Sequence, residues 1–298
     1  MGPLILSLPG NESIADAIAV KSKAERAELT LRRFPDGEIY VRIETPVTGR
    51  EVILVCTLHR PDEKILPLML VAAAAKDLGA LRVGLVAPYL AYMRQDRRFK
   101  PGEGVTSLYF ARLLSTFIDW LVTVDPHLHR RNSLDEIYPV HTAVVHAAPR
   151  ISEWIRTHVK NPVLVGPDSE SAQWVRAVAG GAGAPYLVLE KMRRGDLDVE
   201  VSVPDAEQLR NHTPVLVDDI ISTARTMIET IRNLRREGLA EPVCVGVHAV
   251  FSDDAYDELK EAGAAQVVTC NTISHSSNAI DLTDLLAESL VGICATSF

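Results

Sequence analysis

The sequence predicts an α/β protein in which mostly parallel sheets are flanked by helices. Short runs rich in Val, Leu and Ile alternate along the chain with longer segments whose apolar residues recur at helical spacing. Continuous apolar runs are typical of strands buried on both faces, as in a parallel sheet. Strands that alternate with helices in this way indicate a doubly wound fold.

The expected elements can be placed one after another along the chain. A first strand is expected in the apolar run near the amino terminus. Later apolar runs predict strands within residues 51–56, 81–90, 119–127, 162–168, 214–220, 242–250 and 265–272. The segments of helical spacing between them are residues 62–80, 105–117, 169–180 and 223–238. Two of these end near a glycine, which can serve as a helix C-cap.

Composition limits the possible functions. The chain has 298 residues, 47% of them hydrophobic and 23% charged, enough for one large domain or two of about 150 residues. Its net charge of −8 gives no basic field for nucleic acid, so small-molecule substrates are expected. No apolar run reaches membrane-spanning length, and the amino-terminal run is too short for a signal peptide. Four cysteines without C-x-x-C spacing predict buried thiols in a reducing cytoplasm.

The pattern of strands and helices occurs twice. It predicts two similar domains, residues 1–147 and 148–298, with a boundary near Ala147 to Arg150. The segment 190–212 lies between two expected strands and is polar, charged and poor in core residues. It is expected to be an exposed arm or mobile loop that can close over a site.

Carboxylates follow three of the expected strands, at Asp125, at Asp168, and at Asp218 with Asp219. Ligands of open parallel sheets bind at the carboxyl ends of the strands, so these side chains are expected along one edge. An alternative for Asp168 is that it only caps the next helix. The acidic strand ends, with His127 nearby, favour sugar hydroxyls and magnesium bound together with phosphate oxygens.

The stretch "DIISTART" at 219–226 combines hydroxyl side chains with the amides at the start of a helix. Free amides, hydroxyl donors and the positive end of the helix dipole all favour a phosphate monoester. The run therefore fits a sugar phosphate, with the carboxylates on the sugar hydroxyls and the turn on the phosphate.

This run also resembles a known family. "LVDDIISTART" at 216–226 is similar to the phosphoribosyl diphosphate loop of the type I phosphoribosyltransferase fold. In their order and spacing, the stretches at 34–43, 88–107, 124–130, 166–170 and 189–194 resemble ribose-phosphate diphosphokinase. The compact length is closer to archaeal-type members. The resemblance implies two tandem phosphoribosyltransferase-like domains, with nucleotide elements in the first and the ribose 5-phosphate loop in the second.

The resemblance implies a role for each matching residue. The ATP-binding residues would be Phe34, Asp36 and Glu38 of a neighbouring subunit together with Arg94, Gln95, Arg97 and His127. The metal ligands would be Asp125, His127 and Asp168. The residues that bind ribose 5-phosphate would be Asp218, Asp219, Ser222, Thr223, Ala224, Arg225 and Thr226. Lys191 and Arg193 match the catalytic lysine and arginine of the family.

The reaction implied is transfer of the diphosphoryl group of ATP to the anomeric hydroxyl of ribose 5-phosphate, which gives 5-phosphoribosyl 1-diphosphate and AMP. Such catalysis is mostly alignment and cancellation of negative charge, for which lysine, arginine and magnesium are suited. A cytoplasmic homo-oligomer, a dimer or larger, is expected, with the ATP site shared between subunits.

Two stretches depart from the family pattern. Glu170 and Ser171 stand in a turn where the family has small residues. Ala224 and Arg225 replace two glycines, and a left-handed backbone there would cost roughly 1 kcal/mol or more. These changes leave open the alternative that the chain is a non-catalytic regulatory relative, which binds nucleotide and pairs with an active subunit. A third alternative is a phosphoribosyltransferase that consumes 5-phosphoribosyl 1-diphosphate, although such an enzyme needs no ATP and therefore no nucleotide elements at 34–43 and 88–107.

Overall fold

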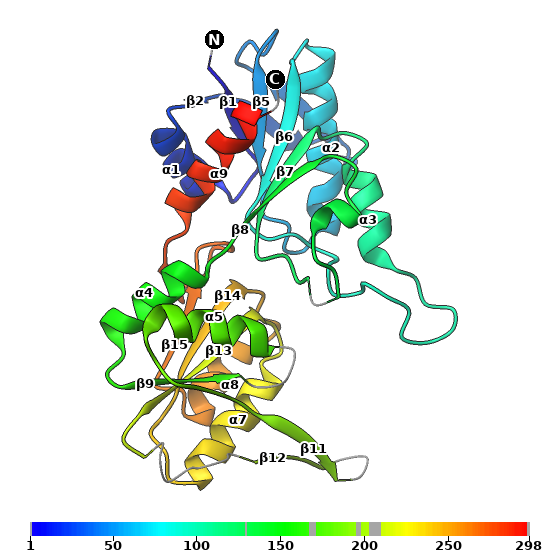
Figure 1. Cartoon of the computed structure of the whole chain (residues 1–298). Coiled ribbons are helices and arrows are strands. Elements are labelled where there is room, and N and C mark those ends of the chain that lie inside the picture. The colour runs from blue at the N-terminus through cyan, green and yellow to red at the C-terminus, as the bar shows by residue number, and fades with distance from the viewer. Residues whose placement is uncertain (1, 129, 167–170, 195–197, 203–209, 297–298) are drawn as a thin grey trace. The chain divides into compact units, whose positions relative to one another are not determined.

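Two six-stranded parallel sheets with the same strand order organise the chain (Figure 1). The computed structural model describes residues 2–128, 130–166, 171–194, 198–202 and 210–296. It divides into unit 1, residues 1–145 with 283–298, and unit 2, residues 146–282. Within these described ranges, no helix is long and apolar enough to cross a membrane.

The sheet of unit 1 has the order β2-β1-β5-β6-β7-β8, and every neighbouring pair is parallel. Its strands are β1 (Leu4–Ser7), β2 (Glu25–Arg26), β5 (Glu51–Val55), β6 (Arg82–Ala87), β7 (Trp120–Val124) and β8 (His141–Val145). The aliphatic side chains of β5, β6 and β7 are fully buried over most of their length. Burial on both faces explains why these strands are continuous apolar runs in the sequence.

Helices cover both faces of the unit 1 sheet. Helices α1 (Glu12–Ser22) and α9 (Thr283–Thr296) pack side by side on one face (Figure 1). The opposite face carries α2 (Asp62–Asp77) and α3 (Thr106–Leu114). A short 3-10 helix, η1 (Leu134–Glu136), precedes β8. This is the doubly wound arrangement that the sequence predicted.

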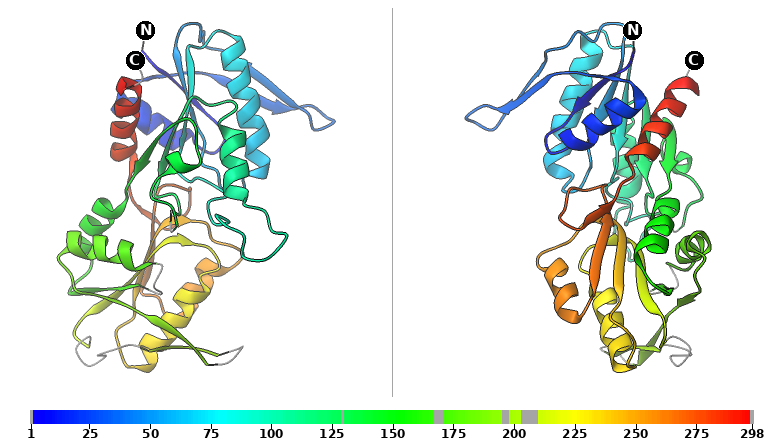
Figure 2. Two further views of the ribbon diagram at one scale, coloured as in Figure 1. Left: turned by 45° about the vertical axis from the view of Figure 1, so that its right-hand side comes forward. Right: turned by 90° about the vertical axis from the view of Figure 1, so that its left-hand side faces the viewer.

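A separate antiparallel hairpin extends from unit 1. It consists of β3 (Leu29–Arg33) and β4 (Ile39–Ile43), with Leu29 opposite Ile43 and Arg33 opposite Ile39. Strand β4 packs against α2, and both views in Figure 2 show the end of this blue arm extending beyond the helices of its unit. Its turn includes Gly37, whose φ of 93° suits a residue without Cβ.

Unit 2 repeats the order of unit 1, as β10-β9-β13-β14-β15-β16. Its strands are β9 (Pro162–Gly166), β10 (Tyr186–Val188), β13 (Thr213–Ile221), β14 (Val243–Ala249), β15 (Gln266–Cys270) and β16 (Asn278–Ile280). Helices α4 (Ala148–His158) and α5 (Ala172–Ala182) pack together on one face; α7 (Arg225–Arg236) and α8 (Ala255–Ala262) pack on the other (Figure 1). The prediction of two similar α/β domains is therefore confirmed.

The segment 190–212, expected to be an exposed arm or mobile loop, contains an antiparallel hairpin, β11 (Glu190–Arg194) with β12 (Asp198–Ser202). One expectation about domain organisation needs correction. Residues 283–298 were expected in the second domain, but α9 packs against α1, β7 and β8 of unit 1. Helix α4 follows β8 along the chain and packs against α5 and β16 within unit 2, as expected for the second domain.

Candidate functional site

The strand order of each sheet reverses at one point, and the loops beside that point are the expected ligand sites. In unit 1 the chain starts at β1 and moves outward to β2 on one side and to β5 on the other. In unit 2 the equivalent of β1 is β9, which has β10 on one side and β13, the equivalent of β5, on the other. Ligands of doubly wound sheets bind outside the carboxyl ends of strands at such a switch point. The loop after β13 is the stretch predicted to bind a sugar phosphate.

The two aspartates of that stretch lie near the carboxyl end of β13 and are half-buried. Asp218 pairs in register with Gly246 of β14. The Oδ1 atom of Asp218 accepts a hydrogen bond from the backbone amide of Asp219 at 3.0 Å. This bond fixes the first carboxylate against the strand end, where parallel strands gather their ligand-binding groups.

The turn after β13 contains a residue with a left-handed backbone conformation, at one of the two positions where the family has glycine. Ala224 has φ 53° and ψ 7°, and α7 begins at the next residue, Arg225. No side chain caps the start of α7. The carbonyl of Ser222 accepts from the amide of Ser252 at 3.3 Å, which ties the turn to the β14–α8 loop. The first-turn amides and the helix dipole therefore remain directed at any anion bound here.

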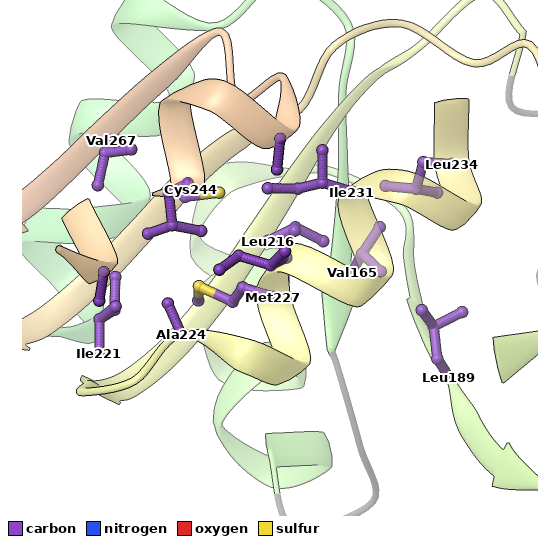
Figure 3. Packing of buried hydrophobic residues seen from close by; sticks show 14 of the residues in the cluster. Val165, Leu189, Leu216, Ile221, Ala224, Met227, Ile231, Leu234, Cys244 and Val267 are labelled. Carbon is purple, nitrogen blue, oxygen red and sulfur yellow. The ribbon is translucent and has the colours of Figure 1, made fainter. Parts of the chain in front are cut away.

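The core of unit 2 holds this strained turn in place. Ala224 is 9% exposed and belongs to a cluster in which α7 packs against the sheet. Figure 3 shows Ala224 and Met227 beside Leu216 of β13, with Ile221 at the end of that strand. The buried methyl group offsets part of the cost of the left-handed backbone, since burial of one carbon contributes about 0.8 kcal/mol. Alanine at this position is thus accommodated by the core.

The hydroxyl and arginine side chains of the turn lie on its outer side. Thr223 and Arg225 are exposed, and Ser222 and Thr226 are half-buried. All the predicted sugar phosphate residues that the structure describes, residues 218, 219 and 222–226, are therefore on one strand end, one turn and the start of one helix. This arrangement presents carboxylates followed by donors in a single continuous run.

The predicted catalytic residues belong to the β11–β12 hairpin of unit 2. The backbone of Lys191 pairs with Val201, and that of Arg193 with Val199. Asp168 and Glu170 lie outside the described residues. Ser171 is buried and precedes the first residue of α5.

In unit 1, the predicted nucleotide residues Arg94, Gln95 and Arg97 lie in the loop after β6. Arg94 and Arg97 are exposed, and Gln95 is half-buried with its carbonyl accepting from the amide of Ser107 at 3.3 Å. Farther along the loop, the Glu103 carboxylate accepts from the amides of Phe99 at 2.7 Å and Lys100 at 3.0 Å. The loop is therefore closed upon itself, with two arginines facing outward.

Asp125 and His127 follow β7, the next strand of the same sheet, and both are half-buried. Asp125 has φ 29°, an uncommon backbone conformation for a residue other than glycine, and its amide donates to the carbonyl of Val145 at 3.0 Å. Strained backbone of this kind gathers at functional sites. Arg130, three residues after His127, forms an ion pair with Asp96 at 3.2 Å, so this loop is tied to the loop after β6.

The remaining nucleotide residues, Phe34, Asp36 and Glu38, are exposed in the turn of the β3–β4 hairpin. The amide of Phe34 donates to the carbonyl of Glu38 at 2.8 Å, and Asp36 Oδ1 accepts from the amide of Glu38 at 3.1 Å. The guanidinium of Arg32 lies 4.9 Å from the centroid of the Phe34 ring. These contacts fix a tight turn whose aromatic and acidic side chains face solvent.

Sequence reasoning missed four residues that shape these loops: Asp96, Arg130, His59 and Lys64. The Nζ of Lys64 donates to the carbonyl of Thr57 at 2.8 Å and lies 2.9 Å from Nδ1 of His59, in the loop after β5. Burial, followed by the charge of Lys64, lowers the pKa of His59 from 6.5 to about 4, and burial also lowers the pKa of Lys64. The stretch "LHRPDEK" gave no periodic signal for this contact, and the aspartate between arginines in "RQDRR" does not identify Arg130 as its partner.

The described residues contain no group of three or more His, Cys, Asp or Glu side chains placed to hold a metal ion. Asp125 and His127 are the predicted ligands within the described ranges. Magnesium keeps several waters and is commonly held by one or two carboxylates together with substrate phosphates. A single carboxylate beside a nucleotide loop fits that mode of binding.

Comparison with known proteins identifies the family. The profile described as the N-terminal domain of ribose phosphate pyrophosphokinase matches residues 4–117, and the phosphoribosyl transferase domain matches residues 133–285. The ribose-phosphate pyrophosphokinase of Sulfolobus acidocaldarius is 32% identical over 85% of this chain and 87% of its own. That of Methanopyrus kandleri is 32% identical over 96% of this chain and 98% of its own.

A solved structure shows the same fold. The crystal structure of phosphoribosylpyrophosphate synthetase from Mycobacterium smegmatis matches with a TM-score of 0.86 and 23% identity, and the match covers 100% of both chains. Both archaeal relatives and both family profiles agree with the resemblance found in the sequence. The chain belongs to the ribose-phosphate pyrophosphokinase family.

Proposed function

We propose that the protein is a ribose-phosphate diphosphokinase, which transfers the diphosphoryl group of ATP to the anomeric hydroxyl of ribose 5-phosphate. The carboxylate pair and uncapped turn at the end of β13 carry this proposal. The carboxylates can accept hydrogen bonds from sugar hydroxyls, and the turn that follows them can bind a phosphate. This is the order that a sugar phosphate requires. Membership of the family supplies the second substrate, ATP, and the products, 5-phosphoribosyl 1-diphosphate and AMP.

Unit 2 would hold the sugar. Asp218 and Asp219 would accept hydrogen bonds from the ribose hydroxyls, since ionised carboxylates are acceptors only. The amides and hydroxyls of residues 222–226 would donate to the 5-phosphate, and the positive end of the α7 dipole would favour its charge. Arg225 adds a full positive charge at the same place.

Unit 1 would bind the nucleotide through Arg94, Gln95, Arg97 and His127. The exposed guanidiniums of Arg94 and Arg97 suit phosphate oxygens, because arginine presents several donors in a fixed geometry. Magnesium would be held by Asp125, His127 and Asp168 together with the phosphates. Bound there, it would neutralise negative charge on the triphosphate.

The reaction then requires little covalent chemistry from the protein. The anomeric oxygen of the sugar forms a bond to the β-phosphorus, the bond between that phosphorus and the oxygen on the α-phosphorus breaks, and AMP leaves with the electron pair. The proton of the attacking hydroxyl is released. Lys191 and Arg193 would stabilise the charge on the transferred group, which is where such enzymes gain most of their rate. A hairpin closed over the site would also exclude water as a competing nucleophile.

The ATP site would be shared between subunits of a homo-oligomer. Phe34, Asp36 and Glu38 are exposed at the end of a hairpin that projects from unit 1 (Figure 2), where a second copy could receive them. A cytoplasmic location accords with the four cysteines, none of which forms a disulfide and three of which are buried.

Release of AMP from magnesium ATP tests the function. The purified protein is expected to release one AMP per 5-phosphoribosyl 1-diphosphate, and only when ribose 5-phosphate is present. Nucleotide binding without turnover would instead indicate the regulatory relative, and ADP as the product would show a different phosphoryl transfer.

Mixing inactive variants tests the shared site. Asp36→Ala and Arg97→Ala should each lose activity. When the two variants are mixed and their subunits exchange, part of the activity should return, because some sites then combine a natural hairpin from one subunit with a natural ATP loop, residues 94–97, from the other. Demonstrated subunit exchange without recovery would contradict a composite site.

A further inference from the structure

Asp96 lies between Gln95 and Arg97, two residues proposed to bind ATP, but its own side chain is only 4% exposed. Both of its carboxylate oxygens lie 3.2 Å from Nη1 of Arg130. Its carbonyl oxygen also accepts from Nη2 of Arg131 at 3.4 Å. A buried carboxylate is rarely found without a partner, and here the partners come from the loop after β7.

The loop after β7 is fixed independently on its other side. Nη1 of Arg131 lies 3.5 Å from Oε2 of Glu136, and the same carboxylate accepts from the amide of Asn132 at 2.8 Å. Glu136 is in η1, so Arg131, which donates to the Asp96 carbonyl, is itself attached to regular structure. The main chain at Asp96 is therefore held by a residue that is fixed on its other side.

The two loops also meet at an aromatic ring. The guanidinium carbon of Arg97 lies 4.9 Å from the centroid of Phe99, and that of Arg130 lies 5.6 Å from the same centroid. Cation–π contacts at these distances are weakly attractive at an exposed site. Arg97 is thus linked to Arg130 twice, through its neighbour Asp96 and through Phe99.

We infer that Asp96 and Arg130 form a positioning pair that fixes the ATP loop, residues 94–97, against the loop that carries Asp125 and His127. This inference rests on the proposed function. Without the Asp96 carboxylate, the loops would bring together Arg97, Arg130 and Arg131, whose charges repel one another. The ATP loop would then sample other conformations, and nucleotide binding would have to restore the ordered one.

Asp96 is not placed to bind the nucleotide itself. Its carboxylate is buried against Arg130, and a carboxylate would repel the triphosphate if it turned outward. Its effect must therefore pass through the arginines beside it. If Asp96 were purely structural, its loss would lower stability without weakening the binding of one substrate more than the other. If it is a positioning residue, its loss weakens ATP binding specifically.

The experiment compares Asp96→Asn, Arg130→Met, the double variant and the conservative Arg130→Lys with the natural protein. Michaelis constants for ATP and for ribose 5-phosphate are measured, with ATP affinity by titration without sugar and thermal unfolding in parallel. Glu51→Gln is the matched control. Glu51 is a half-buried carboxylate, 13% exposed, that lies 2.7 Å from Arg82 at the amino ends of the strands.

Asp96→Asn and Arg130→Met are each expected to raise the Michaelis constant and the dissociation constant for ATP about tenfold or more, with the Michaelis constant for ribose 5-phosphate within about twofold. The double variant should be no worse than the worse single variant, because one interaction is lost in each. Arg130→Lys should recover part of the affinity. Glu51→Gln should lower the unfolding temperature but leave both constants unchanged.

Lower stability with unchanged ATP affinity would overturn the inference, as would additive effects, which would mean that each side chain acts separately. If Asp96→Asn does not fold, the comparison of Arg130→Lys with Arg130→Met decides between the two outcomes. Failure of the natural protein to form product would refute the proposed function instead, and the ATP titration would still test the pair.

Discussion

Replacement of Arg225 by alanine should weaken sugar binding and stabilise the fold at the same time. Arg225 is the first residue of α7, it is exposed, and no acidic residue stands in the first turn of that helix. A cation at the amino end of a helix opposes the helix dipole, at a cost of about 0.3 to 1 kcal/mol. Alanine removes this cost and has the higher helix propensity. A residue that lowers stability where alanine would raise it suggests a function for the charge.

The functional magnitude follows from the contact that Arg225 is proposed to make. A charge-assisted hydrogen bond to a phosphate contributes about 1.5 to 3 kcal/mol. The Michaelis constant for ribose 5-phosphate should therefore rise roughly 10- to 150-fold in Arg225→Ala. The constant for ATP should stay within about twofold. Steady-state AMP release measures both constants, and urea unfolding measures the expected gain of about 0.3 to 1 kcal/mol.

Arg232→Ala supplies the control for loss of charge alone. Arg232 is exposed on the same helix, seven residues or about 10 Å farther along the axis. At physiological salt its charge is largely screened from the turn, so its removal should change neither constant. Equal small effects of Arg225→Ala and Arg232→Ala on the Michaelis constant for ribose 5-phosphate would refute the proposed contact of Arg225 with the phosphate. Lower stability of Arg225→Ala would refute the unfavourable interaction of Arg225 with the helix dipole.

Three further predictions test other parts of the molecule. Gly84→Ala places a Cβ 1.9 Å from the buried Trp120 ring, so it should lower the free energy of unfolding, measured with urea, by about 1 to 3 kcal/mol. Adding Trp120→Leu to the same chain should recover part of that loss, and an unchanged free energy in Gly84→Ala would contradict the packing. His59 has its pKa lowered from 6.5 to about 4, so its contribution to stability is complete above pH 6.5 and lost as pH falls toward 4; His59→Gln should flatten that part of the stability profile, and an unchanged profile would exclude His59 as its source. Lys191→Ala should lower turnover by about 10³-fold, or about 4 kcal/mol, with little change in sugar binding, and unchanged turnover would remove the catalytic assignment.

The sequence predicted the parts of the fold that depend on local pattern. Fully buried parallel strands have a distinctive composition, so β5, β6, β7, β13, β14 and β15 were expected near their observed positions. The turn at 222–226 could be predicted because a strand end, hydroxyl residues and a helix start follow one another directly. Each of these signals lies within about fifteen residues of chain, the range over which periodicity is informative.

The features that the sequence did not predict depend on contacts between distant residues. α9 resembles any apolar helix in sequence, and only its packing against α1 assigns it to unit 1. Of the β11–β12 hairpin, β11 (EKMRR) is charged and lacks the alternation of a half-buried strand, whereas β12 (DVEVS) does alternate polar and apolar residues. Asp96 and Arg130 are 34 residues apart, and either alone is typical of a solvated surface.

The two units show where the function of this fold resides. Both have the same strand order, so the loop after β5 is the topological equivalent of the loop after β13. In unit 2 the carboxyl-terminal part of β13 holds Asp218 and Asp219. In unit 1, β5 is followed by Cys56, a thiol whose pKa burial raises to about 12, and by Thr57, whose carbonyl accepts from Lys64. A buried neutral thiol cannot accept the hydrogen bonds that ribose hydroxyls offer to carboxylates. The sugar site is therefore expected in unit 2 alone, and unit 1 can serve the nucleotide through loops after other strands of an equivalent sheet.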